Sequence, residues 1–220
     1  MEDGKNIVYC SGPLFCPEEI AGMTAISNVL ENAGYQTFLP HRDGLEYYLM
    51  PLINSPLSNL PSPKKSLSRM IFALDVYQIV ERCDAFVFNM NGRVPDEGGV
   101  SEAGIAFASG KPLVIYKNDN RSVFNGDDNS MVSCLSYSPL ISDIQKIPEV
   151  LRRVANDVQK AGGSPYQGNN IPPAVKDTVA LGRKVWNTMK TFRLNGGTPK
   201  QDKELIHQIT QLCDTPELLV

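Results

Sequence analysis

A cluster of carboxylate residues in the middle of the 220-residue chain is the stretch best suited to chemistry. It begins where the apolar run Ala85–Asn89 ends, and it contains, among turn residues, Asp96, Glu97 and Glu102. Glu102 lies near the start of a predicted helix, whose N-terminus favours an ionised carboxylate by about 0.3–1 kcal/mol if the carboxylate is exposed. An ionised carboxylate can act as a nucleophile toward the anomeric carbon of a sugar. Alternatively, Glu102 only complements the helix dipole, and its spacing alone does not decide between the two interpretations.

Two more aspartates precede the same apolar run. Asp75 lies in the otherwise apolar stretch Ile71–Val76, where a partly buried carboxyl group would have a raised pKa and hold a proton. Asp84 stands directly before the run, a position typical of a turn between a helix and a strand. Asp75 is therefore a candidate acid, and Asp84 is predicted to be structural.

The turn that closes the first apolar segment, Ser11–Phe15, is a second candidate region. Gly12 would let the backbone approach a ligand, although an ordinary turn between a strand and a helix explains the same residues. The turn has neither the Gly-x-Gly-x-x-Gly pattern nor a phosphate-binding lysine motif, so the usual machinery for dinucleotides and triphosphates is missing. His41 and His207 are not spaced as metal ligands, and no Ser or Cys lies in a nucleophile elbow.

The elements that must position these residues follow from the apolar periodicity. Helical patterns over residues 17–33, 70–83, 100–109 and 143–161 alternate with short apolar runs, which we interpret as strands. Continuous apolar strands that alternate with helices predict a parallel sheet covered on both faces. We expect an α/β fold with a doubly wound, mostly parallel five-stranded sheet, flavodoxin-like or Rossmann-like, that binds ligands beyond the carboxyl ends of its strands. The predicted strands are Asn6–Cys10, Tyr35–Leu39, Ala85–Asn89, Leu113–Tyr116 and a weaker one near Cys134–Tyr137.

Two segments fall outside this alternation. Residues 41–68 are rich in proline and predict a long loop, a functional lid or a disordered segment, with one short helical turn near Leu45–Met50. Beyond a linker at Gly162–Asn170, apolar residues at helical spacing predict two helices separated by Asn195–Gly197, with stripes typical of a core. We therefore expect a main domain over residues 1–161 and a C-terminal helical hairpin extension over residues 171–214.

Composition excludes several classes of protein. A chain with 42% hydrophobic residues can bury one core, and a net charge of −3 disfavours nucleic acid as a partner. The five cysteines have irregular spacing, which is typical of free thiols in a reducing cytosol rather than of zinc or redox sites. No apolar run approaches the ~20 residues that span a bilayer, and the acidic N-terminus is not a signal peptide. We expect a cytoplasmic protein without membrane contact.

Five pieces of sequence, each weak alone, occur in a specific order. They are Tyr9–Phe15, Gly34-Tyr35 with Leu39–Gly44, Asp75 with Asp84, Asn91-Gly92 with Pro95–Gly98 and Glu102–Ala106, and Gly110–Pro112. In this order they resemble the nucleoside 2-deoxyribosyltransferase family, over about residues 6–135. Members of that family are typically shorter, so the resemblance does not explain the helical extension.

The resemblance implies roles for the matched residues. The nucleophilic glutamate of the family falls on Glu102, and the aromatic hydroxyl that orients it falls on Tyr9. Two aspartates that face the base fall on Asp75 and Asp96, and we favour Asp75 as the proton donor because its neighbours are apolar. Asn129 matches an asparagine that binds sugar hydroxyls in the site of a neighbouring subunit. The remaining implied substrate contacts are Gly12, Pro13, Phe15 against the base, Asn91, Gly92, and Arg42 and Asp43 in the base-end loop His41–Gly44.

The implied reaction transfers 2-deoxyribose between the nucleobases of 2'-deoxynucleosides. A covalent deoxyribosyl-glutamate forms and is resolved by a second base, which is the double displacement of retaining glycosidases. The resemblance implies deoxynucleosides and free nucleobases as partners, no metal or organic cofactor, and a homo-oligomer, either a dimer or a trimer of dimers, because a shared site requires a second copy.

Two other functions stay open. One is hydrolysis of the N-glycosidic bond of deoxynucleosides or of their 5'-monophosphates, although Pro13–Phe15 stands where a phosphate nest of Ser, Gly and Arg would be needed. The other is a non-catalytic nucleotide-sensing module in which the helical extension is an interaction arm. The sequence does not indicate a preference for purines or pyrimidines.

Overall fold

The computed structural model of the protein describes residues 6–48, 64–92, 94–122, 126–162, 172–193 and 199–212. Internal contacts divide the chain into two compact units. The first, which we call the sheet unit, comprises Met1–Leu39 and Ile79–Asn169. The second, which we call the helical unit, comprises Pro40–Gln78 and Asn170–Val220. Each unit is described separately.

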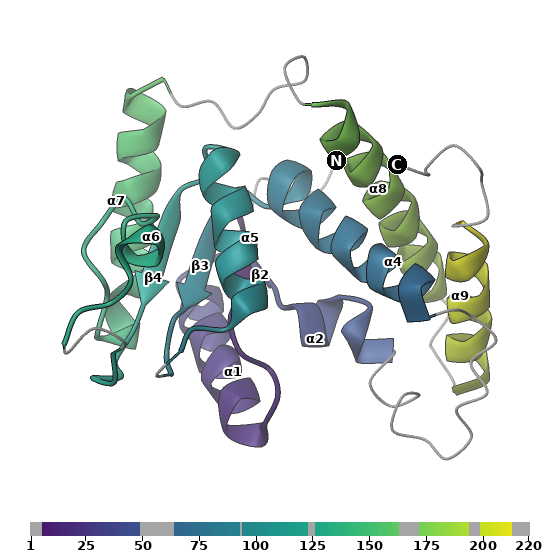
Figure 1. The fold of residues 1–220 in the computed structure, drawn as a ribbon, viewed down its shortest axis with the longest axis horizontal. Coiled ribbons are helices and arrows are strands. Elements are labelled where there is room, and N and C mark those ends of the chain that lie inside the picture. The colour runs from purple at the N-terminus through teal and green to yellow at the C-terminus, as the bar shows by residue number, and fades with distance from the viewer. Residues whose placement is uncertain are drawn as a thin grey trace. The chain divides into compact units, whose positions relative to one another are not determined.

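The sheet unit is built on four parallel strands. They are β1 (Ile7–Ser11), β2 (Gln36–Phe38), β3 (Ala85–Asn89) and β4 (Leu113–Tyr116). Their order is β2-β1-β3-β4, so the chain leaves β1 toward one edge of the sheet and returns on the other side of β1 (Figure 1). This reversal is the topological switch point of a doubly wound sheet, where such folds bind ligands. The predicted α/β class with a parallel sheet is confirmed.

The predicted fifth strand is wrong. Residues 134–138 form turns and bends, and Ile141 makes a single parallel bridge to Tyr116. Pro139 lies just before this bridge and has no amide to donate to a ladder, which is one physical reason for the short pairing.

The two faces of the sheet carry different helices. Helices α1 (Pro17–Asn32) and α7 (Ile147–Lys160) cover one face, and α5 (Glu97–Ala108) lies on the other (Figure 1). Val8 and Cys10 belong to the core beneath α1 and α7. Because side chains alternate along a strand, Tyr9 and Ser11 point to the face on which α5 lies.

Helix α5 begins three residues earlier than predicted. Asp96 is its N-cap, and its side chain accepts a hydrogen bond from the amide of Gly99 at 2.6 Å. The apolar periodicity does not predict this early start, because Gly98 and Gly99 lie in the first turn and glycine is a poor helix former. Two short helices, α6 (Ser130–Ser133) and the 3-10 turn η2 (Ile144–Lys146), complete the sheet unit before α7.

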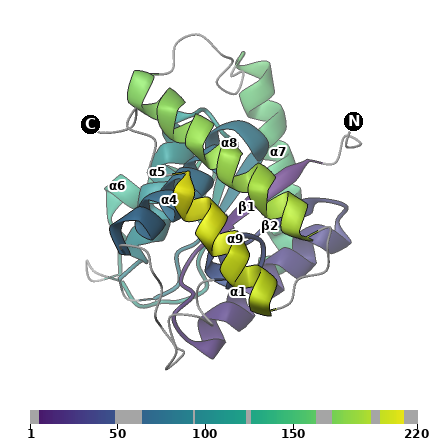
Figure 2. The same cartoon turned by 90° about the vertical axis from the view of Figure 1, so that its right-hand side faces the viewer.

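The helical unit contains α2 (Pro40–Asp43), α4 (Lys64–Tyr77), α8 (Pro173–Arg193) and α9 (Pro199–Gln211). Helix α4 starts six residues before the predicted helix and continues into the π-helical turn η1 (Gln78–Arg82). Helix α8 packs along α4, and α9 packs on both (Figure 2). Residues 46–48 are helical, near the predicted turn, whereas the four prolines of the predicted loop lie outside the described residues.

The compact units do not follow the predicted domain limits. Residues 40–78, which belong to the predicted main domain, share a compact unit with the C-terminal helices. Within that unit α4 packs on α8 and α9. The division at residues 161 and 171 remains a prediction about domains. Among the described residues, no helix is long and apolar enough to cross a membrane.

Candidate active site

The carboxylate of Glu102 is held by two hydroxyl groups from β1. The phenol of Tyr9 donates a hydrogen bond to Oε1 at 2.8 Å, and the hydroxyl of Ser11 donates to Oε2 at 2.5 Å. Each carboxylate oxygen can accept about two hydrogen bonds, so both retain a lone pair for another partner. The structure thus brings together Glu102 and Tyr9 at the carboxyl end of β1, beside the switch point. Ser11 was not predicted to be a partner of the carboxylate.

Two glycines allow this close arrangement. A Cβ atom at Gly99 would lie 2.5 Å from the ring of Phe88 and 3.1 Å from Oγ of Ser11, so α5 approaches the sheet where only a glycine fits. Glu102 is three residues further on and therefore lies on nearly the same side of α5. A Cβ atom at Gly12 would lie 2.7 Å from Cβ of Asn89, so the chain after β1 passes directly against the end of β3.

The ring of Tyr9 is fixed between two aromatic neighbours in the sheet. Its centroid lies 5.3 Å from that of Phe38 on β2 and 5.3 Å from that of Phe86 on β3, in stacked arrangements. Tyr9 is fully buried. A rigid aromatic side chain holds its hydroxyl in one place, so the carboxylate is oriented before any substrate arrives.

The pKa of Glu102 is raised from 4.5 to about 7. Burial is the largest cause, because it disfavours the charged form, and the negative charge of Asp96 adds to it. The hydrogen bonds from Ser11 and Tyr9 oppose this rise because they stabilise the carboxylate. The sequence predicted that the helix N-terminus favours the ionised form of an exposed carboxylate, but burial of Glu102 raises its pKa instead.

Asn91 and Gly92 lie in a clamp between two loops. Oδ1 of Asn91 accepts hydrogen bonds from the amides of Asn118 and Asp119, at 2.9 and 3.1 Å. In return, the amide of Gly92 donates to Oδ2 of Asp119 at 3.1 Å, and the side chain of Arg121 pairs with the same carboxylate. The loops after β3 and β4 are therefore joined in both directions. Asp119 was not predicted from sequence, because nothing in its spacing indicates a partner 27 residues away.

The turn after β1 and the start of α6 carry the exposed candidates. Phe15, the residue predicted to pack on the base, is 83% exposed, and its amide donates to Glu19 at 2.7 Å. Asn129 is the exposed N-cap of α6, and its Oδ1 accepts a hydrogen bond from the amide of Met131 at 3.0 Å. Met131 is 79% exposed. The roles predicted for Pro13, Phe15 and Asn129 remain predictions.

Two residues of the sequence motifs have structural contacts. Asp84 accepts a hydrogen bond from the amide of Ile7 at 2.8 Å and so fixes the start of β1, in agreement with its predicted structural role. Lys111 is buried, and its ammonium group donates to the carbonyl of Cys83 at 2.7 Å, at the end of η1.

The other predicted site residues belong to the helical unit. Asp75 lies on α4 and is 9% exposed. Arg42 and Asp43 lie on α2 and form an ion pair with an N–O distance of 2.9 Å. Their parts in a site remain predictions. No cluster of three or more potential metal ligands occurs among the described residues.

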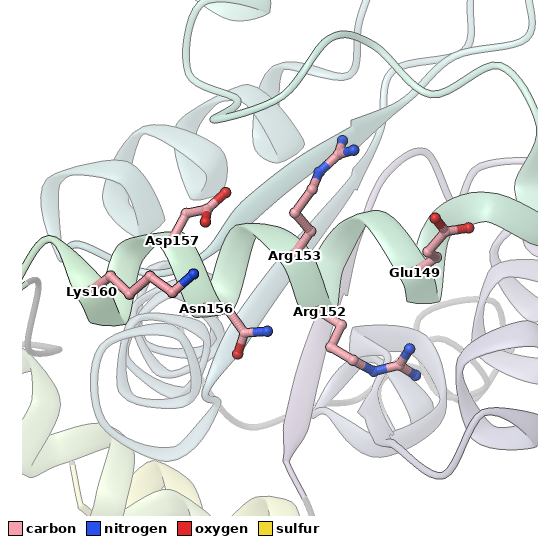
Figure 3. Close-up of a pocket in the computed structure, with 6 residues that line it drawn as sticks. All are labelled: Glu149, Arg152, Arg153, Asn156, Asp157 and Lys160. Carbon is pink, nitrogen blue, oxygen red and sulfur yellow. The ribbon is translucent and has the colours of Figure 1, made fainter.

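A shallow hollow of about 250 Å³ lies elsewhere, on the outward side of α7. Figure 3 shows Arg153 and Asp157 on one side of the helix and Arg152 and Asn156 on the other. The charged side chains therefore do not converge on a common point, and all the lining residues come from one helix. We assign no role to this hollow.

The sequence model of one protein family, described as nucleoside 2-deoxyribosyltransferase, matches residues 8–158. The chain belongs to this family. The resemblance drawn from the sequence motifs is therefore confirmed, and the match ends before α8 and α9, which have no counterpart in the matched region.

Solved structures with a similar fold include a conserved protein from Enterococcus faecalis V583, which is 19% identical. Its TM-score is 0.52, over 68% of this chain and 98% of that one, so it supports the α/β fold of this nucleoside 2-deoxyribosyltransferase family member. A 2-desoxiribosyltransferase from Leishmania mexicana is 16% identical with a TM-score of 0.41, over 69% of this chain and 97% of that one. No curated protein sequence matches the chain.

Proposed function

We propose that this family member transfers 2-deoxyribose between nucleobases, with Glu102 as the covalent nucleophile. The observation that carries the proposal is the pair of hydrogen bonds from Tyr9 and Ser11, which orient the Glu102 carboxylate at the switch point of the sheet. Family membership supports deoxyribosyl transfer as the general activity.

The proposed reaction has two displacements. In the first, a carboxylate oxygen of Glu102 attacks C1' of the deoxynucleoside, and the N-glycosidic bond breaks with its electron pair moving to the base. A proton from Asp75 neutralises the departing base, and an ester between C1' and Glu102 remains. In the second, another base attacks C1', loses a proton to Asp75 and releases the Glu102 carboxylate. Two inversions at C1' retain the configuration.

The surroundings of Glu102 support both displacements. Burial makes the carboxylate less stabilised than in water, which raises its reactivity toward an electron-poor carbon. The Tyr9 and Ser11 hydroxyls regain full hydrogen bonding to the carboxylate when the ester breaks, so they stabilise the leaving group of the second step. The fraction of ionised enzyme then rises with pH through about 7.

We further propose that the protein is a homo-oligomer in which Asn129 contributes to the site of a neighbouring copy. Its Oδ1 is engaged at the start of α6, so the group offered to a sugar hydroxyl is the Nδ2 amide, which donates. The exposure of Asn129 and of Met131 supports a contact of this kind. Asp96, Phe15, Arg42 and Asp43 remain the proposed contacts to the base.

The test is an exchange assay with a matched control. A 2'-deoxynucleoside is mixed with a different free base, and the new nucleoside is measured by chromatography for the native protein, for Glu102→Ala and for Glu97→Gln. We expect exchange by the native protein and by Glu97→Gln, whose exposed carboxylate lies on the same helix, and none by Glu102→Ala. Release of free deoxyribose without exchange would favour the hydrolase, and absence of turnover would favour the sensing module.

A further inference from the structure

The C-terminal helices lie outside the region that matches the family, and none of their residues has a role in the proposed reaction. Helix α8 nevertheless packs along α4, the helix that carries Asp75 (Figures 1 and 2). Both helices belong to the helical unit, so this contact can be followed residue by residue.

The contact is closest at Gly182 on α8. A Cβ atom at this position would lie 2.0 Å from the carbonyl oxygen of Ala73 and 2.6 Å from Cβ of Tyr77, about 1 Å inside the 3.0 Å that real Cβ atoms keep. The obstacle at Ala73 is backbone, which cannot rotate out of the way as a side chain can. Next along α8, the guanidinium of Arg183 lies 6.0 Å from the ring centroid of Tyr77, within cation–π range. Gly182 and Arg183 of α8 therefore contact the same turn of α4.

This turn of α4 is the one that contains Asp75. Ala73 and Tyr77 are four residues apart and lie on one side of the helix. Asp75 is two residues from each, and at about 100° per residue it lies about 200° around the helix, on the opposite side. Helix α8 thus packs on the side of α4 that is opposite Asp75. This contact does not cover the side of α4 that carries the Asp75 carboxyl group.

We propose that the C-terminal extension acts as a buttress for the Asp75 helix, with Gly182 as a positioning residue for protonation of the departing base. The inference rests on the proposed role of Asp75 as proton donor. A substitution that pushes α8 away from Ala73 would release the α4 turn and displace the carboxyl group, and a misplacement of about 1 Å can cost on the order of a hundredfold in rate.

The test uses the full-length chain and first-turnover release of base. The substrates are a series of 2'-deoxynucleosides that differ only in electron-withdrawing substituents on the base. A base that leaves easily needs little protonation, so the slope of log rate against the pKa of the free base measures how much the acid contributes. The variants are Gly182→Ala, Arg183→Ala, Asp75→Asn and the control Lys184→Ala, an exposed position on α8.

We expect Asp75→Asn to steepen the slope and Gly182→Ala to steepen it in the same direction. For Gly182→Ala the rate on the poorest leaving base should fall about tenfold to a hundredfold, with a much smaller loss on the best leaving base. The slope for the double variant Asp75→Asn/Gly182→Ala should be no steeper than the slope for Asp75→Asn alone. The slope and the rates for Lys184→Ala should match those of the native protein. If Gly182→Ala does not fold, Arg183→Ala keeps the backbone contact and should steepen the slope to a smaller extent.

The outcomes separate the two claims. If Asp75→Asn steepens the slope but Gly182→Ala, or Arg183→Ala in its place, lowers all rates by one factor, the buttress proposal is overturned and the acid assignment stands. If Asp75→Asn leaves the slope unchanged, the acid assignment itself fails.

Discussion

The raised pKa of Glu102 makes a prediction about stability that is separate from catalysis. Replacement by Gln keeps the shape of the side chain and its partners, because the amide oxygen can accept from Tyr9 and the amide NH2 can donate to a rotated Ser11 hydroxyl. It removes only the ability to ionise. In the native protein, ionisation of a carboxyl group whose pKa rises from 4.5 to about 7 on folding opposes the folded state.

The sign and size follow from this shift. A group with a raised folded pKa contributes its full stabilisation below the unfolded value of 4.5 and loses it as the pH rises through about 7. A shift from 4.5 to about 7 corresponds to about 3 kcal/mol, at about 1.4 kcal/mol per pKa unit. Glu102→Gln should therefore resemble the native protein in stability near pH 4.5 and exceed it by up to about 3 kcal/mol at pH 8.

The assay is urea unfolding of both proteins across this pH range, followed by far-UV circular dichroism. The fluorescence of Trp186 is less suitable, because this single tryptophan lies on α8 in the helical unit, whereas Glu102 lies on α5 in the sheet unit. Glu97→Gln, which changes an exposed carboxylate on the same helix, should show no comparable growth of the difference with pH. A difference between Glu102→Gln and the native protein that is the same at pH 5 and pH 8 would refute the reasoning.

Three further predictions concern neighbouring residues. Tyr9→Phe removes a hydrogen bond to a charged group worth about 1.5–3 kcal/mol, so exchange should slow and the acid limb of the pH–rate profile should move above its native midpoint. Gly99→Ala should destabilise the protein by about 1–3 kcal/mol, measured by thermal unfolding, because its methyl group meets the ring of Phe88. Asp119→Ala should open the clamp on Gly92 and raise the KM for the nucleoside more than it lowers kcat, whereas an unchanged KM would show that the clamp does not shape the site.

The fold was accessible from sequence where local pattern and tertiary structure agree. The strands at Ala85–Asn89 and Leu113–Tyr116 are buried throughout and, apart from Asn89, apolar, because helices cover both faces of the sheet. A run of this kind predicts a buried parallel strand. The fifth strand was wrong because a single bridge at Ile141 leaves almost no pattern of its own. The early start of α5 was missed because the cap at Asp96 is followed by two glycines.

The site was only partly accessible for a different reason. The motifs indicated Glu102 and Tyr9, but the contribution of Ser11 depends on which residues of β1 face α5, and this follows from the packing. The rise in the pKa of Glu102 was not predicted, because the helix N-terminus is a local feature, whereas burial is a property of the whole fold. The stripes of the C-terminal helices were predicted to be core, but Ala73, the partner of Gly182, is more than 100 residues away from it, and no periodicity connects the two.

The central claim is that Glu102 forms a bond to the sugar. The native protein is mixed with a 2'-deoxynucleoside without an acceptor base, quenched with acid within the first turnover, digested and analysed by mass spectrometry. We predict one deoxyribosyl group on the peptide that contains Glu102, formed as fast as the base is released and lost when an acceptor base is added. Base release without any labelled peptide, or a label on another residue, would contradict the account.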